Sequence, residues 1–149
     1  MHWICISTVL TNTGKHSRDK ASGKRIAPIP ILTASLGDSD VVLRALLDKR
    51  FEELDGLVIS GLGDGDVPSS WVPMLRKLMK SDIPIVLTSR YPDGIVQATE
   101  NYEGSASQLL EMGLISAGML SPYQARIRLA VGLASGLKGH ELADYMVNK

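Results

Sequence analysis

The sequence has little of what marks secreted, disulfide-stapled or zinc-stabilised proteins. It contains one cysteine, Cys5, among 149 residues, so no disulfide can form within the chain. No Cys/His cluster has the spacing of zinc ligands, and we expect neither a structural metal nor a cofactor. These absences favour a reducing compartment, and we predict a cytoplasmic protein.

An excess of charge of either sign is also missing. Sixteen Lys and Arg balance sixteen Asp and Glu, which gives a formal net charge of +0. Proteins that hold nucleic acids through the phosphate backbone usually carry a basic patch, so we expect no nucleic-acid partner. The apolar opening MHWICISTVL lacks a basic segment before it and is too short to span a bilayer, so we expect no membrane segment.

The length suits one compact domain. Residues 11–27, TNTGKHSRDKASGKRIA, are rich in Lys, Arg, Ser, Thr and Gly, which is typical of a solvated linker. We therefore divide the chain into an N-terminal extension and linker at 1–27 and a folded α/β domain at 28–149.

Within the folded part, β-branched apolar runs alternate with helical patterns. Runs without polar alternation are typical of parallel strands that are covered on both faces, and we predict strands at 29–35, 56–62 and 84–90, with a short fourth at 113–116. Helices are predicted at 38–54, 69–79, 105–112, 121–135 and 140–148. The alternation predicts a three-layer Rossmann-like α/β domain, with a mostly parallel sheet of about four strands flanked by helices.

Two features of the predicted helices can be checked against a structure. Apolar stripes at helical spacing should face the core: Val42, Leu46 and Leu47 in the first helix, and Trp71, Leu75, Leu78 and Met79 in the second. Capping boxes should open the third and fourth helices: Ser105 with Gln108, and Ser121 with Gln124.

The loop after the second strand, GLGDGDVPSS at 61–70, is the most informative stretch. Ligands of open parallel sheets bind beyond the carboxyl ends of the strands, where the loops after the first three strands should meet. Glycines at alternate positions permit a close backbone approach, and a helix beginning at Ser69 or Ser70 offers free N–H groups. The same loop carries two carboxylates, Asp64 and Asp66.

Four interpretations of this loop remain open. A dinucleotide fingerprint would need glycine where Asp66 stands, and a phosphate would meet two carboxylates. A divalent metal would accept Asp64 and Asp66 as oxygen ligands. A free amino acid fits better, because its ammonium needs acceptors and its carboxylate needs donors. The loop can also be a plain tight turn, and Glu100 and Glu103 can be solvated acids in an irregular stretch.

Three consecutive stretches, DGLVISGLGDGDVP, PIVLTSRYPDG and YEGSASQLLEMGLISAGMLSPYQARIRLAVGL, resemble the C-terminal domain of the bacterial-type L-asparaginase and glutaminase family. The likeness runs in order from about Pro28 to the end of the chain. It implies that a separate N-terminal domain carries the threonine nucleophile, as TGGT and TDT motifs that this sequence lacks. We therefore expect no catalytic residue in this chain, because Thr11 and Thr13 lie in linker-like surroundings.

The resemblance also implies site residues and partners. Asp66 stands where the family usually has an Asn that contacts the bound amino acid from across a subunit interface, and Glu100 matches a Glu near the substrate ammonium. We predict Asp66, Glu100 and Asp64 as substrate-binding residues for L-asparagine or a related small amino acid. The expected role is completion of that site and assembly of a homo-oligomer, a dimer at least. A stand-alone amino-acid-binding module without catalysis and a purely structural assembly domain are the alternatives.

Overall fold

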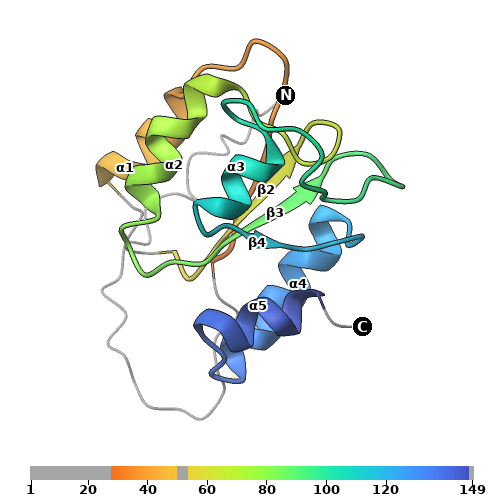
Figure 1. Cartoon of the computed structure of the whole chain (residues 1–149). Helices are drawn as coiled ribbons and strands as arrows, with labels where there is room; N and C mark the ends of the chain where they lie inside the picture. Colours follow the sequence, from red (N-terminus) through yellow and green to blue (C-terminus); the bar gives the residue numbers. More distant parts are fainter. Residues whose placement is uncertain (1–27, 50–53, 148–149) are drawn as a thin grey trace, which may run out of the picture.

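The computed structural model describes residues 28–49 and 54–147 (Figure 1). The predicted extension and linker at 1–27 lie outside the described residues. Four strands form one sheet: β1 (Ile31–Thr33), β2 (Leu57–Gly61), β3 (Ile85–Ser89) and β4 (Ile115–Ser116). Their order in the sheet is β1-β2-β3-β4, and every neighbouring pair is parallel. The predicted fold class, an α/β domain with a parallel four-stranded sheet, is confirmed.

Helices cover both faces of this sheet. They are α1 (Val41–Lys49), the short 3-10 helix η3 (Ser69–Trp71), α2 (Val72–Leu78), α3 (Ala106–Glu111), α4 (Pro122–Ala134) and α5 (Gly139–Val147). Figure 1 shows α1, α2 and α3 on one side of the sheet and α4 and α5 on the other. Connections between neighbouring parallel strands are right-handed. Because the strands lie in the sheet in the same order as in the sequence, right-handed connections place all three crossover helices on the same face. The fold therefore has three layers.

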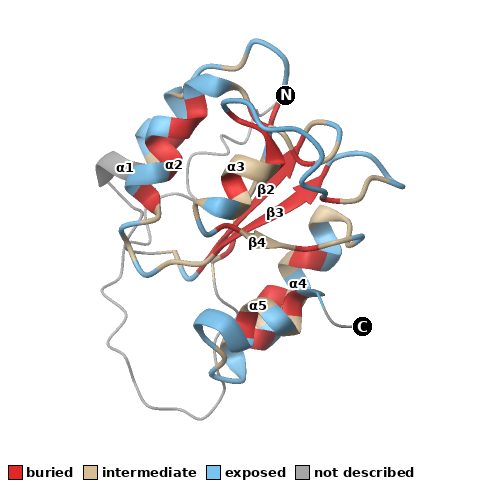
Figure 2. Ribbon diagram, viewed as in Figure 1, coloured by how far each residue is buried: buried red, intermediate tan, exposed pale blue. Residues whose placement is uncertain are grey.

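The core divides into two clusters, one on each face of the sheet. Alternate strand residues point to opposite faces, so Leu57 and Ile59 join the helices α1 to α3, while Val58 joins α4 and α5. All residues of β2 and β3 are buried, as Figure 2 shows for the centre of the sheet. Burial on both faces explains why these strands read as continuous apolar runs.

The predicted core stripe of the first helix is partly wrong. Val42 is 53% exposed, whereas its neighbour Leu43 is fully buried and Leu46 packs against the first cluster. A helical period of 3.6 residues allows two stripes offset by one position in a run as apolar as VVLRALL, and the sequence cannot choose between them. The Leu47 side chain lies outside the described residues. The stripe of α2 is confirmed, with Trp71, Leu75 and Leu78 buried and Met79 packed against them.

Capping follows the prediction at α4 and departs from it at α3. At α4, Ser121 Oγ accepts the Gln124 N–H at 3.4 Å, and Gln124 Oε1 accepts the Ser121 N–H at 3.0 Å. This is a complete capping box. At α3, Ser105 Oγ accepts the Gln108 N–H, but Gln108 Oε1 instead accepts the N–H of Gly104 at 2.9 Å. Across residues 28–49 and 54–147, no helix is long and apolar enough to cross a bilayer.

Candidate functional site

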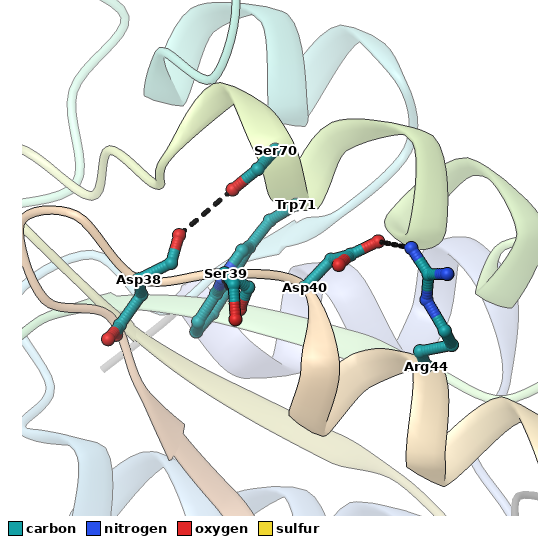
Figure 3. A network of polar contacts seen from close by, with 6 residues as sticks. All are labelled: Asp38, Ser39, Asp40, Arg44, Ser70 and Trp71. Atoms are coloured by element: carbon teal, nitrogen blue, oxygen red, sulfur yellow. Dashed lines mark hydrogen bonds and ion pairs between the residues drawn. The ribbon is translucent and has the colours of Figure 1, made fainter.

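Three loops leave the carboxyl ends of the first three strands, and we call residues 34–40, 62–68 and 90–104 the first, second and third loops. The first loop is fixed to the helix that follows the second loop (Figure 3). Ser70 Oγ donates to the Asp38 carbonyl at 3.0 Å, and Trp71 Nε1 donates to the Ser39 carbonyl at 3.1 Å. Asp40 pairs on the surface with Arg44 at 2.6 Å. The first loop is thus held against η3 by hydrogen bonds.

The second loop is a tight turn that requires glycine at two positions, Gly61 just before it and Gly65 within it. Leu62 and Asp66 exchange two backbone hydrogen bonds of 2.8 Å each, so the chain folds back on itself within five residues. Gly65 has a φ of 116°, a backbone conformation that residues with a side chain rarely adopt. A Cβ on Gly61 would lie 2.5 Å from the backbone of Gly65. The alternating glycines therefore serve the turn itself, and the turn presents Asp64 and Asp66 on the same side of the sheet end.

The third loop runs beside the second and is joined to it by hydrogen bonds. Thr99 Oγ1 donates to Asp64 Oδ2 at 2.9 Å, and the Gln97 N–H donates to the Asp64 carbonyl at 3.2 Å. Further along, the Val67 N–H donates to the Gly104 carbonyl at 2.8 Å. These three hydrogen bonds therefore join the two loops, although more than thirty residues separate the partners in the sequence.

Asp66 connects the second loop both to the third loop and to the start of α3. Its Oδ1 accepts the N–H of Ala106, the first residue of α3, at 2.9 Å. Its Oδ2 accepts the hydroxyl of Tyr102 at 2.5 Å. The sequence analysis assigned the free N–H groups at Ser69 or Ser70 to a ligand and predicted no donor to Asp66. That donor comes from α3, which begins 40 residues after Asp66.

A depression of about 240 Å³ opens between the second and third loops. Its lining residues, all within the described part of the chain, are neutral or acidic. They belong to Gly63, Asp64, Asp66, Gln97, Thr99, Glu100 and Ala106. We call this depression the acid pocket. It brings together the three residues predicted from the sequence as substrate-binding, Asp64, Asp66 and Glu100; whether they bind substrate stays a prediction. Glu103, the other acid of that stretch, is exposed and is not among the lining residues.

The electrostatic effect of the three acids appears on Tyr102. The hydrogen bond to Asp66 raises the pKa of Tyr102 to about 12, with smaller contributions from burial and from the charges of Asp66, Glu100 and Asp64. Deprotonation would place a phenolate beside these carboxylates, which like-charge repulsion disfavours. Tyr102 therefore remains a neutral hydroxyl donor at every physiological pH.

The sequence analysis missed three polar groups of the site: Tyr102, Thr99 and Gln97. Each lies in the irregular stretch after β3, where no periodicity indicates which side chains turn inward. The predicted N-cap Ser105 was the nearest sequence signal for Tyr102, because the residues just before a helix are held in a defined turn. In the structure the Ser105 N–H donates to the Tyr102 carbonyl at 3.0 Å. As for metal ions, the described residues contain no group of three or more His, Cys, Asp or Glu arranged to hold one.

This chain resembles known proteins both in its sequence and in its fold. The Glutaminase/Asparaginase C-terminal domain family matches residues 29–146. This chain belongs to that family. Among curated proteins it is similar to the "Probable L-asparaginase" of Deinococcus radiodurans, 34% identical over 91 residues. The "L-asparaginase" of Bacillus licheniformis is 33% identical over 88 residues. These alignments cover 61% and 59% of this chain.

The relatives are much longer than this chain. The aligned part spans 27% of both the Deinococcus and the Bacillus proteins. Among solved structures, the "Probable Cytoplasmic L-asparaginase" of Campylobacter jejuni is 25% identical with a TM-score of 0.67, and the superposition covers 82% of this chain and 35% of that one. The part of this chain that aligns therefore spans about a third or less of these relatives. The residues that line the acid pocket lie within the range 29–146 that the family matches.

Proposed function

We propose that this chain forms the C-terminal part of an L-asparaginase-type amidohydrolase, and that its acid pocket accepts the ammonium group of L-asparagine or a related small amino acid. One observation carries the proposal. Three carboxylates from two loops, Asp64, Asp66 and Glu100, open into one depression at the carboxyl end of a parallel sheet. That edge is where open α/β sheets bind their ligands.

The chemistry of the acid pocket suits an ammonium group. An ammonium carries three N–H donors and one positive charge, and the pocket offers carboxylate acceptors. At about 4 Å a pair of unit charges attracts by about 1 kcal/mol in water, and by about 4 kcal/mol at the effective dielectric near a protein surface. The volume of about 240 Å³ lies below the range of about 300–1,000 Å³ for drug-sized ligands, which favours a ligand as small as an amino acid.

The acid pocket supplies the binding half of the proposed reaction. Hydrolysis of the side-chain amide gives aspartate and ammonia, and it needs a nucleophile within hydrogen-bond reach of its activating base. The resemblance assigns these groups to an N-terminal domain. The carboxylates of this chain would fix the α-ammonium and so hold the amide at the nucleophile, an effect of orientation. A homo-oligomer in which the acid pocket faces the catalytic groups of another subunit, in the cytoplasm, completes the proposal.

The first test is titration of the full chain with L-asparagine, followed by amide NMR, with ammonia measured in the same sample. We expect the shifts to centre on Gly63, Thr99 and Ala106, without ammonia release until a separately produced asparaginase N-terminal domain is added. The absence of any shift at these positions would contradict the proposal. Ammonia release by the chain alone would contradict the assignment of the nucleophile to another domain.

A pair of glutamates provides matched variants for the same titration. Glu100 lines the acid pocket, and Glu103, three residues later, is exposed outside it. Exposed ion pairs contribute about 0.2–1 kcal/mol, so E100Q should weaken L-asparagine binding by about 1.4- to 5-fold. E103Q removes the same charge from the same loop and should have a smaller effect. Equal effects of the two variants would indicate a general charge effect rather than a site.

A further inference from the structure

Tyr102 lies outside the lining of the acid pocket and contacts one of its lining residues, Asp66. Its carbonyl accepts the Ser105 N–H at 3.0 Å, and its own N–H donates to Ser105 Oγ at 3.3 Å. This turn leads directly into α3, whose N-cap is Ser105. From this turn the Tyr102 hydroxyl reaches Asp66 across 36 positions in the sequence. The backbone of Tyr102 is thus fixed independently of the contact that its side chain makes.

We propose that Tyr102 is a positioning residue, which acts through Asp66 to hold that carboxylate in the orientation that receives the ligand ammonium. The proposal rests on the proposed function of the acid pocket and extends it to a residue outside the pocket lining. Its basis is that the two oxygens of Asp66 are held by different donors: Oδ1 by the Ala106 N–H at 2.9 Å and Oδ2 by the Tyr102 hydroxyl.

Two donors on different oxygens fix a carboxylate more fully than one donor does. With the Ala106 bond alone, the carboxyl group of Asp66 can still turn about its side-chain torsions, and binding a ligand must then restrict that motion. The Tyr102 hydroxyl removes this freedom before the ligand arrives. A carboxylate has about four lone-pair sites, so two hydrogen bonds leave acceptor capacity for an ammonium. Asp66 can therefore be held in place and still bind.

The charges around Tyr102 keep this arrangement intact over the working pH range. Asp66, Glu100 and Asp64 are the charged groups that act on its hydroxyl, and all three disfavour the phenolate. The hydroxyl therefore stays a donor, and the carboxylate stays the acceptor. Tyr91 offers a matched control, since its exposure of 49% is close to the 47% of Tyr102, while its ring lies against Arg90.

The test measures binding of two probes to the full chain and to its Y102F and Y91F variants. L-asparagine carries the α-ammonium, and succinamic acid is the same molecule without it. A hydrogen bond contributes about 0.5–1.5 kcal/mol, so Y102F should weaken L-asparagine binding by about 2- to 12-fold. Succinamic acid binding should be unchanged by Y102F, and Y91F should affect neither probe. An equal loss for both probes would show a merely structural role, and no loss for either would show no role; both results overturn the proposal.

A measurement without any ligand separates this proposal from the function of the pocket. Titration of ¹³C-labelled tyrosine should show Tyr102 ionising near pH 12, and D66N should lower that pKa towards the ordinary value of about 10. A wild-type Tyr102 that titrates near 10 would mean that the hydroxyl does not hold Asp66, and would overturn the positioning role alone. If the wild-type chain binds neither probe, the proposed function fails, and the positioning role fails with it.

Discussion

Gly104 lies at a direct backbone contact between the two loops of the acid pocket, and replacing it with alanine tests how the site is built. Its carbonyl accepts the Val67 N–H at 2.8 Å, and its φ is 93°. A Cβ at this position would overlap the carbonyl oxygen of Val67, which is backbone and cannot move aside like a flexible side chain. We therefore expect G104A to separate the second and third loops.

The size of the effect follows from two contributions. A left-handed backbone costs an alanine about 1–2 kcal/mol, and forcing extra atoms into a packed region typically costs about 1–3 kcal/mol more. Gly118 isolates the first contribution, because its φ is 58° and a Cβ there would have no atom within 4 Å. G104A should thus be less stable than G118A by about 1–3 kcal/mol. At about 2–4 °C per kcal/mol for a chain of this size, the melting temperatures should differ by about 2–12 °C.

Thermal unfolding of G104A and G118A, each compared with the wild type, measures this difference. Separation of the loops has a second signature, since the Tyr102 hydrogen bond to Asp66 spans the same two loops. The pKa of Tyr102 should fall from about 12 in G104A and remain near 12 in G118A. Equal melting temperatures for the two variants, together with an unchanged Tyr102 titration in G104A, would refute the idea that contact at Gly104 sets the spacing of the loops.

Two further predictions concern the core and the pH dependence of stability. Leu129 is fully buried in the cluster between the sheet and the helices α4 and α5, so L129A should cost about 2–5 kcal/mol in urea unfolding, whereas I127A, at a position 62% exposed on the same helix, should stay within about 0.5 kcal/mol. Because the folded state raises the pKa of Tyr102 from 10.0 to about 12, its contribution to stability is complete below pH 10 and is lost as the pH rises from about 10 to about 12. Urea unfolding at about pH 9 and about pH 11 should show a smaller decline for Y102F than for the wild type, and an equal decline would contradict this assignment.

Local signals in the sequence predicted the fold well. The second and third strands were expected at 56–62 and 84–90 and lie at Leu57–Gly61 and Ile85–Ser89. Because these two strands are buried on both faces, their sequences are continuous apolar runs, which made them easy to predict. The outer strands are shorter than predicted, with Ile31–Thr33 against 29–35 and Ile115–Ser116 against 113–116. Within the described residues each outer strand pairs with one neighbour only, so hydrogen bonding on a single side decides where it ends.

The errors arise where the outcome depends on tertiary contacts. The choice of Val42 over Leu43 as a core residue fails because the sequence does not say how the helix is rotated against α2. In the same way, the helix that donates to Asp66 could not be identified from the loop itself. The sequence next to Asp66 contains a helix start at Ser69, whereas the actual donor is the N–H of Ala106. Only the order of the strands brings that donor within reach.

The two aspartates of the glycine loop are explained by this pairing. Asp64 accepts the hydroxyl of Thr99, and Asp66 accepts the hydroxyl of Tyr102 and the N–H of Ala106, so each carboxylate ties the second loop to a different part of the segment after β3. Donors from that segment offset the repulsion between two acids that are close in sequence. Assembly of the pocket and its proposed affinity for an ammonium therefore depend on the same carboxylates. A change at Asp66 consequently tests both properties together, whereas a change at Glu100, which lines the pocket from an exposed position, tests the charge more directly.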